Sequence, residues 1–278
     1  MLRSLVLILG AALSLVAADP KFSQPFPPHK VIGNVYYVGT SELSSFLITT
    51  PQGHILINSS FEESVPVIRQ GIEKLGFKFS DVKILLISHA HDDHTAGSAL
   101  VKKLTGAKFM VMDADVPVVE GGGVGDFNYN SRWTPTKVDR VLHDGDTVAL
   151  GGSVLTAHLT AGHTKGCTTW TLKVADGGKS YDVVIVGSPN VNAGFKLVNN
   201  AKYPQIAEDY AKSFRVWKSQ HCDVFLGAHG NYYGMQEKYK KLQAGGANPF
   251  IDPTGYRAYI DEKYQTFESK LKEQRAGK

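Results

Sequence analysis

Short apolar segments with two different periods alternate along the chain. Residues 34–39, 45–50 and 54–58 are predicted as strands, with a Pro-Gln-Gly turn at 51–53 between the last two. Residues 82–87 form an unbroken apolar run, which is typical of a strand buried on both faces. Further strands are predicted at 108–112, 153–160, 167–174, 181–187 and 222–228.

Helical spacing separates these strands. Val65, Ile68, Ile72 and Leu75 recur on one helical face, and Ser60 with Glu63 resembles a capping box at its start. Further helices are predicted at about 95–104, at 206–217, and from 252 onward, where the apolar stripe comprises Tyr256, Ile260, Tyr264, Phe267 and Leu271. Strands interleaved with helices predict a layered α/β or α+β protein with a single domain.

The first 18 residues have the pattern of a removed secretory signal. Arg3 supplies the positive charge, residues 5–16 the apolar region, and residues 16–18 a small-residue cleavage site. The apolar run is short for a membrane span, so we expect a mature domain of residues 19–278, exported to the periplasm and not bound to a membrane.

Composition excludes several classes of protein. The 278 residues carry 30 basic and 26 acidic side chains without a basic run longer than a pair, so a nucleic-acid partner is not expected. Two cysteines are too few for a disulfide scaffold or a cysteine-rich zinc module.

Four potential metal ligands follow the buried strand within six residues. His89 and His91 are two apart in an extended segment and therefore point to the same side. Asp93 and His94 follow where the chain turns into a helix and are available to a second cation. A catalytic zinc takes three protein ligands and keeps a position for water, so each site needs one more ligand.

The two missing ligands are predicted at the ends of later strands. His163 follows strand 153–160 and His229 follows strand 222–228, and both are flanked by glycine, which permits close approach of the backbone to the metals. This assigns His89, His91 and His163 to one site, and Asp93, His94 and His229 to the other. Five remaining histidines are interpreted as structural: His29, His54, His143, His158 and His221.

At these residues the chain resembles the metallo-β-lactamase superfamily. The resemblance implies a four-layer αβ/βα sandwich that holds two Zn²⁺ ions in a groove at the edge of the sheets. The strand at 181–187 ends in Gly187-Ser188-Pro189, without the bridging aspartate of lactone and thioester hydrolases or the cysteine of other β-lactamases. With His94 as a ligand, the chain is therefore most similar to subclass B3.

The chain also departs from that subclass. Phe195 stands where members often carry a tyrosine whose hydroxyl helps the developing oxyanion, and Asn190 and Asn192 match the polar residues that hold the substrate carboxylate. Cys222 matches one half of a family disulfide, but Tyr256 replaces the other half. Because Cys167 and Cys222 are predicted at opposite ends of strands, roughly 20 Å apart, we expect two free thiols.

The resemblance implies a monomeric, zinc-dependent hydrolase that opens the amide bond of small-molecule β-lactams. Asp93 is then a catalytic residue as well as a ligand, because its free oxygen can orient the attacking water. Two alternatives stay open. One is a lactone or thioester hydrolase of the same fold, and the other is a non-catalytic zinc-binding protein.

Overall fold

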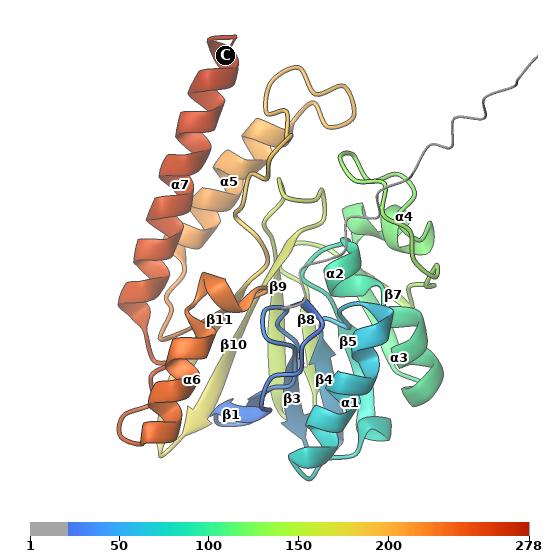
Figure 1. Cartoon of the computed structure of the whole chain (residues 1–278), viewed down its shortest axis with the longest axis vertical. Coiled ribbons are helices and arrows are strands. Elements are labelled where there is room, and N and C mark those ends of the chain that lie inside the picture. Colours follow the sequence, from blue (N-terminus) through green and yellow to red (C-terminus); the bar gives the residue numbers. More distant parts are fainter. Residues whose placement is uncertain (1–21, 278) are drawn as a thin grey trace, which may run out of the picture.

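The computed structural model describes residues 22–277 and builds them around two β-sheets (Figure 1). The signal segment predicted at 1–18 lies outside the described residues. The first sheet contains seven strands in the order β1 to β7: His29–Ile32, Val35–Tyr37, Phe46–Thr50, Gly53–Ile57, Val82–Leu86, Lys108–Met112 and Arg140–Leu142. The second sheet has the order β12-β11-β10-β9-β8, where β8 to β12 are Thr147–Leu150, Ser153–Leu159, Thr168–Asp176, Lys179–Val186 and Val224–Gly227.

Helices cover the outer faces of the two sheets. Helices α1 and α3 lie on one side of the molecule and α5 and α7 on the other, with the sheets between them, as the predicted four-layer sandwich requires (Figure 1). The helices α1 to α7 are Val65–Lys74, Asp92–Thr95, Ser98–Thr105, Val116–Glu120, Ile206–Ser219, Met235–Ala244 and Pro253–Arg275.

Side chains that point alternately to the two faces of the first sheet explain the sandwich. In β5, Ile84 and Leu86 face the cluster that lies between the sheets, whereas Leu85 faces the cluster under the helices α1 and α3. Successive side chains of a strand point to opposite faces, so an unbroken apolar run satisfies both clusters. The prediction of a strand buried on both faces is confirmed.

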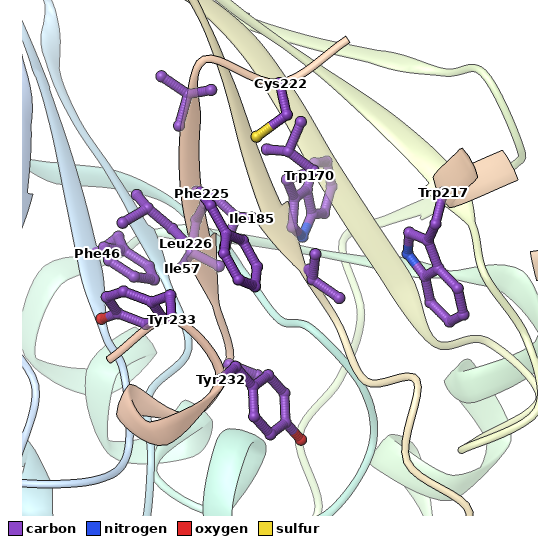
Figure 2. Close-up of a cluster of buried hydrophobic side chains, with 14 of the residues drawn as sticks. Phe46, Ile57, Trp170, Ile185, Trp217, Cys222, Phe225, Leu226, Tyr232 and Tyr233 are labelled. Carbon is purple, nitrogen blue, oxygen red and sulfur yellow. The ribbon is translucent and has the colours of Figure 1, made fainter. Parts of the chain in front are cut away.

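Large aromatic side chains fill the space between the sheets (Figure 2). Phe46 from the first sheet lies 6.4 Å from the ring of Tyr233, and Phe225 of β12 lies 6.2 Å from the same ring. Trp170 of β10 is buried and donates its indole N–H to the carbonyl of Ile87 at 3.0 Å, which ties the second sheet to the end of β5.

One local prediction about helices is wrong, and another is right except for where the helix begins. Ser60 is not a helix cap, because its backbone is left-handed (φ 58°) and α1 begins only at Val65, after a 3-10 turn. The helix expected at 95–104 is broken into α2 and α3 around Gly97. Gly97 donates its backbone N–H to the carbonyl of Ser60 at 2.8 Å, and a side chain there would lie 2.6 Å from Val65, so only glycine fits at this break.

The prediction of two free thiols is confirmed. Both Cys167 and Cys222 are buried and unpaired, and Cys222 lies among the apolar side chains of the core (Figure 2). Where the resemblance suggests a disulfide, Tyr256 donates its hydroxyl to the carbonyl of Trp217 at 2.8 Å. In residues 22–277, no helix combines the length and apolarity that a bilayer crossing needs.

Candidate functional site

The topology brings the ends of distant strands to one edge of the molecule. Strands β9 and β11 both run antiparallel to β10, which lies between them, and β12 runs parallel to β11. Their carboxyl ends therefore lie at the same edge of the second sheet. The segment that follows β5 in the first sheet meets them there, and the six predicted ligands converge.

The first cluster consists of His89, His91 and His163. Their ring centroids are 4.6 to 4.8 Å apart, and one ring nitrogen from each lies within 4.8 Å of the others. His163 lies in the turn between β9 and β10, and its Nδ1 is 2.9 Å from the backbone carbonyl of Asn190. Since a carbonyl only accepts, Nδ1 carries the proton, and the lone pair of Nε2 is left for a metal.

The second cluster consists of Asp93, His94 and His229. The Nε2 atoms of the two histidines are 3.2 Å apart, and Oδ2 of Asp93 lies 3.3 Å from the first and 3.4 Å from the second. The same three atoms would surround one cation. His94 is also close to the first cluster, with its ring 4.3 Å from that of His89.

His89 is the strongest indication of a metal. It is 1% exposed, and neither of its ring nitrogens has a hydrogen-bond partner among the described residues. A buried imidazole without any partner is costly, and polar groups in protein interiors are nearly always satisfied. His89 belongs to one group of potential ligands with His91 and His163 and to another with Asp93 and His94, so it borders both clusters.

The protonation states of the site also suit metal binding. Burial lowers the pKa of His89 and of His163 well below the ordinary value of imidazole. Burial and the neighbouring His94 lower the pKa of His229 to about 4. Burial alone would raise the pKa of Asp93, but the imidazoles of His94 and His229 outweigh it and lower that pKa. Neutral imidazoles and an ionised carboxylate are the forms that coordinate metals.

Two buried aspartates that the sequence analysis missed hold the ligand loops. Asp115, just after β6, accepts hydrogen bonds from the backbone N–H of Ala90, the hydroxyl of Thr164 and the backbone N–H of Gly166, each at 2.8 Å. It thereby joins the loop of His89 and His91 to the loop of His163. Its place at the carboxyl end of a strand beside β5 was the one available signal in the sequence.

Asp126 supports the first cluster from another side. Its Oδ2 lies 3.5 Å from Nε2 of His91, and its Oδ1 accepts the backbone N–H groups of Asn128 and Tyr129. Nε2 of His91 has no hydrogen-bond partner among the described residues, but the negative charge beside it favours the proton there and leaves Nδ1 of His91 for a metal. Nothing in the local sequence pattern distinguished this aspartate from an ordinary turn residue.

Gly162 and Gly227, close to His163 and His229 in the sequence, pack against aromatic rings. A side chain at Gly162 would lie 2.6 Å from the ring of Tyr210, and one at Gly227 would lie 2.9 Å from the ring of Tyr232. These two glycines therefore make room for aromatic packing under the ligand loops. Tyr210 in turn donates its hydroxyl to the carbonyl of Asn190, which holds His163.

A cleft of about 640 Å³ opens over the two clusters. Asn190 and Asn192 line it as expected, but Phe195 does not, because it is 2% exposed and packs behind His163 with its ring 5.7 Å away. The glycine-rich segment 121–135 is anchored by buried Phe127 and contributes Tyr129 to the lining. The lining also contains residues that the sequence analysis did not identify: Phe22, Glu42, Phe61, Asp92, Asn231 and Tyr232.

The five histidines interpreted as structural lie outside the lining of this cleft. His29 is stacked among aromatic rings, and His158 hydrogen-bonds to Thr171 at 2.8 Å. His221 is largely exposed and pairs with Asp182 at 3.0 Å and, more loosely, with Asp223 at 3.8 Å.

Comparisons with known proteins agree with this architecture. Residues 39–176 match the family model of the metallo-β-lactamase superfamily. The native FEZ-1 metallo-β-lactamase from Legionella gormanii is 56% identical with a TM-score of 0.90, over 91% of this chain and 98% of that one. BJP-1, a subclass B3 metallo-β-lactamase of Bradyrhizobium japonicum, is 40% identical with a TM-score of 0.86, over 92% and 98% of the two chains. The class B3 di-zinc metallo-β-lactamase LRA-12, from an Alaskan soil metagenome, is 35% identical with a TM-score of 0.87, over 91% and 97%. The chain belongs to the metallo-β-lactamase superfamily and is similar to its subclass B3.

Proposed function

We propose that this protein is a zinc-dependent hydrolase that opens the amide bond of β-lactams, with one Zn²⁺ held by His89, His91 and His163 and a second by Asp93, His94 and His229. The observation that carries the proposal is buried His89, whose two ring nitrogens lack partners where the two clusters meet. The chain's similarity to enzymes described as subclass B3 and di-zinc metallo-β-lactamases supports the substrate class and the count of two.

Zinc ions at these positions would supply a water of lowered pKa and polarise the amide carbonyl. The chain's own residues orient the ligands and the substrate. The carbonyl of Asn190 holds the ring of His163 by a hydrogen bond, and the carboxylate of Asp126 lies 3.5 Å from that of His91. Oδ2 of Asp93 faces His94 and His229, and its second oxygen is our candidate acceptor for a proton of the attacking water.

The side chains of the cleft provide little positive charge for the carboxylate of a β-lactam. Its described lining contains no lysine or arginine, so the second metal and neutral donors would have to hold that group. The amide of Asn190 donates to the hydroxyl of Tyr232 at 2.9 Å, which leaves its second N–H as a donor to substrate. We assign Asn190 and Asn192 to substrate binding on this basis.

Hydrolysis of a chromogenic cephalosporin tests the proposal. We expect turnover that disappears when a chelator removes the metal and returns with added zinc, at about two zinc ions per chain. His163→Ala should lower zinc content and turnover together, whereas His143→Ala, on the exposed surface away from the cleft, should change neither. Turnover that survives complete metal removal would contradict the proposal, and turnover of lactones or thioesters alone would favour the alternative hydrolase.

We also propose that the protein acts as a monomer in the periplasm after removal of residues 1–18. The N-terminal pattern of charge, apolar run and small residues supports export. Mass spectrometry of the exported protein should find a chain that begins near Asp19, and a chain that retains Met1 would contradict the cleavage.

A further inference from the structure

Tyr129 is an aromatic side chain on the wall of the cleft beside the first cluster. Its ring meets that of His91 edge to face, with centroids 4.8 Å apart, and it lines the cleft together with His163 and Asn192. It comes from the segment between α4 and β7. Its backbone is held there by Asp126, the same carboxylate that faces His91.

The direction of one hydrogen bond determines what the Tyr129 hydroxyl can do. Nδ2 of Asn192 donates to that hydroxyl oxygen at 2.8 Å. An amide NH₂ has no acceptor capacity, so the phenol is the acceptor in this bond. The side chain of Asn128 also hydrogen-bonds to this hydroxyl, and like that of Asn192 it lowers the pKa of Tyr129, as a donor to the phenol oxygen does. Neither amide therefore uses the proton of Tyr129, which is available to a group in the cleft.

The second tyrosine of the cleft differs in this respect. The hydroxyl of Tyr232 accepts from the Asn190 amide at 2.9 Å and lies 3.1 Å from the hydroxyl of Ser188, which can accept its proton. Partners inside the protein can thus satisfy both capacities of Tyr232. Phe195, which packs beside Tyr129 with centroids 6.0 Å apart, carries no hydroxyl at all.

We propose that the Tyr129 hydroxyl donates a hydrogen bond to the carbonyl oxygen of the scissile amide when the substrate lies over His89, His91 and His163. This inference rests on the proposed function. As water adds to the carbonyl carbon, the π electron pair of the carbonyl moves onto its oxygen, and the hydrogen bond from Tyr129 strengthens with the developing negative charge. The proton stays on Tyr129. The C–N bond then breaks, and the nitrogen takes a proton that derives from water.

Such a donor acts mainly on the transition state. Removal of one oxyanion donor in a hydrolase lowers kcat by about 100- to 1000-fold, and we expect a smaller loss here because a metal would share the charge. Tyr129→Phe removes only the hydroxyl. It should lower kcat about 10- to 100-fold and change KM by less than about 3-fold, because the lost contact forms in the transition state.

Asn192→Ala tests the arrangement through a positioning residue. This substitution keeps the Tyr129 hydroxyl but removes the amide that holds its oxygen, so we expect a smaller loss in kcat than for Tyr129→Phe. In kcat the double variant should lose no more than Tyr129→Phe alone, because Asn192 affects the transition state through that hydroxyl, whereas loss of its own contact with the substrate carboxylate should raise KM. Zinc content and melting temperature should stay at the unmodified values in all three variants.

Tyr203→Phe is the matched control. Tyr203 packs in the same aromatic cluster, 5.2 Å from Phe127, but it donates its hydroxyl to Asp209 at 2.9 Å and does not line the cleft. Its kcat should equal that of the unmodified protein. If Tyr129→Phe keeps kcat within about 2-fold, raises KM alone, or loses zinc, the inference is wrong. If the unmodified zinc-loaded protein itself opens no β-lactam, the proposed function fails and the inference fails with it.

Discussion

Replacement of Asp115 with alanine would remove the carboxylate that joins the two loops of the first cluster. Asp115 is 1% exposed and accepts three hydrogen bonds of 2.8 Å, from Ala90, Thr164 and Gly166. The alanine variant leaves all three buried donors without a partner. Each stranded donor costs about 1–3 kcal/mol, so the loss from the donors alone is at least about 3 kcal/mol.

Burial of the carboxyl group itself works in the opposite direction. Burial raises the pKa of Asp115, despite the hydrogen bonds that lower it, which shows that the buried negative charge is unfavourable. The alanine variant no longer has this unfavourable term, so part of the lost stability is recovered. We therefore expect a net loss near the low end, about 3 kcal/mol of unfolding free energy. Asp115→Asn should lose less than Asp115→Ala, because its side-chain carbonyl can still accept one of the three bonds.

Chemical denaturation of the metal-free protein measures this loss without a contribution from zinc binding. The matched control is Asp113→Ala, on the exposed side of the same 3-10 turn, where the carboxylate bonds to the adjacent Ala114 N–H. If the free energy of unfolding of Asp115→Ala lay within about 1 kcal/mol of that of this control, the argument from unpaired buried donors would be refuted. Zinc affinity should also fall, by about 10- to 100-fold, because Ala90 lies between two ligands and Thr164 follows a third.

Three further predictions concern other parts of the molecule. Asp126→Asn should weaken zinc binding about 10-fold, because the amide orients the proton of His91 less firmly than the carboxylate, and unchanged affinity in a zinc titration would contradict that role. The two cysteines should react with a thiol reagent at pH 8 only when the protein unfolds, because both are buried and burial raises the pKa of Cys222 to about 12. Rapid labelling of the folded protein would disprove this. Asp252 caps α7, and although burial raises its pKa, the ammonium of Lys238 lowers it below the ordinary value. The contribution of Asp252 to stability is therefore present above about pH 4 and is lost as the pH falls through its lowered pKa. Asp252→Ala should reduce the free energy of unfolding by about 1–2 kcal/mol at pH 7 and by progressively less in acid. Denaturation at several pH values would show this dependence.

The chain's own sequence was sufficient for the layered fold and for the six residues of the two clusters. The periods of strands and helices arise from local geometry. The apolar run at 82–87 and the apolar stripe of α7 were therefore enough to predict which side chains are buried, although the elements that cover them were not known. The crowding of His89, His91, Asp93 and His94 is likewise visible in one short segment. His163 and His229 followed from the rule that polar residues at strand ends gather at one edge.

Other features depended on partners that are distant in the sequence. The left-handed backbone of Ser60 and the break at Gly97 arise where the start of α3 packs against the segment before α1, and no local propensity encodes that contact. The capping box was therefore mispredicted.

The support of the site was also decided by tertiary structure alone. Asp115 is one of several aspartates after β6, and only its contact with loops 25 to 51 residues away makes it a brace between ligands. Tyr129 and Asp126 lie in the glycine-rich segment 121–135, where burial of Phe127 anchors the chain and Tyr129 joins the lining of the cleft. A sequence shows which residues can coordinate or donate, but the direction of a hydrogen bond depends on which groups the completed fold places opposite each other.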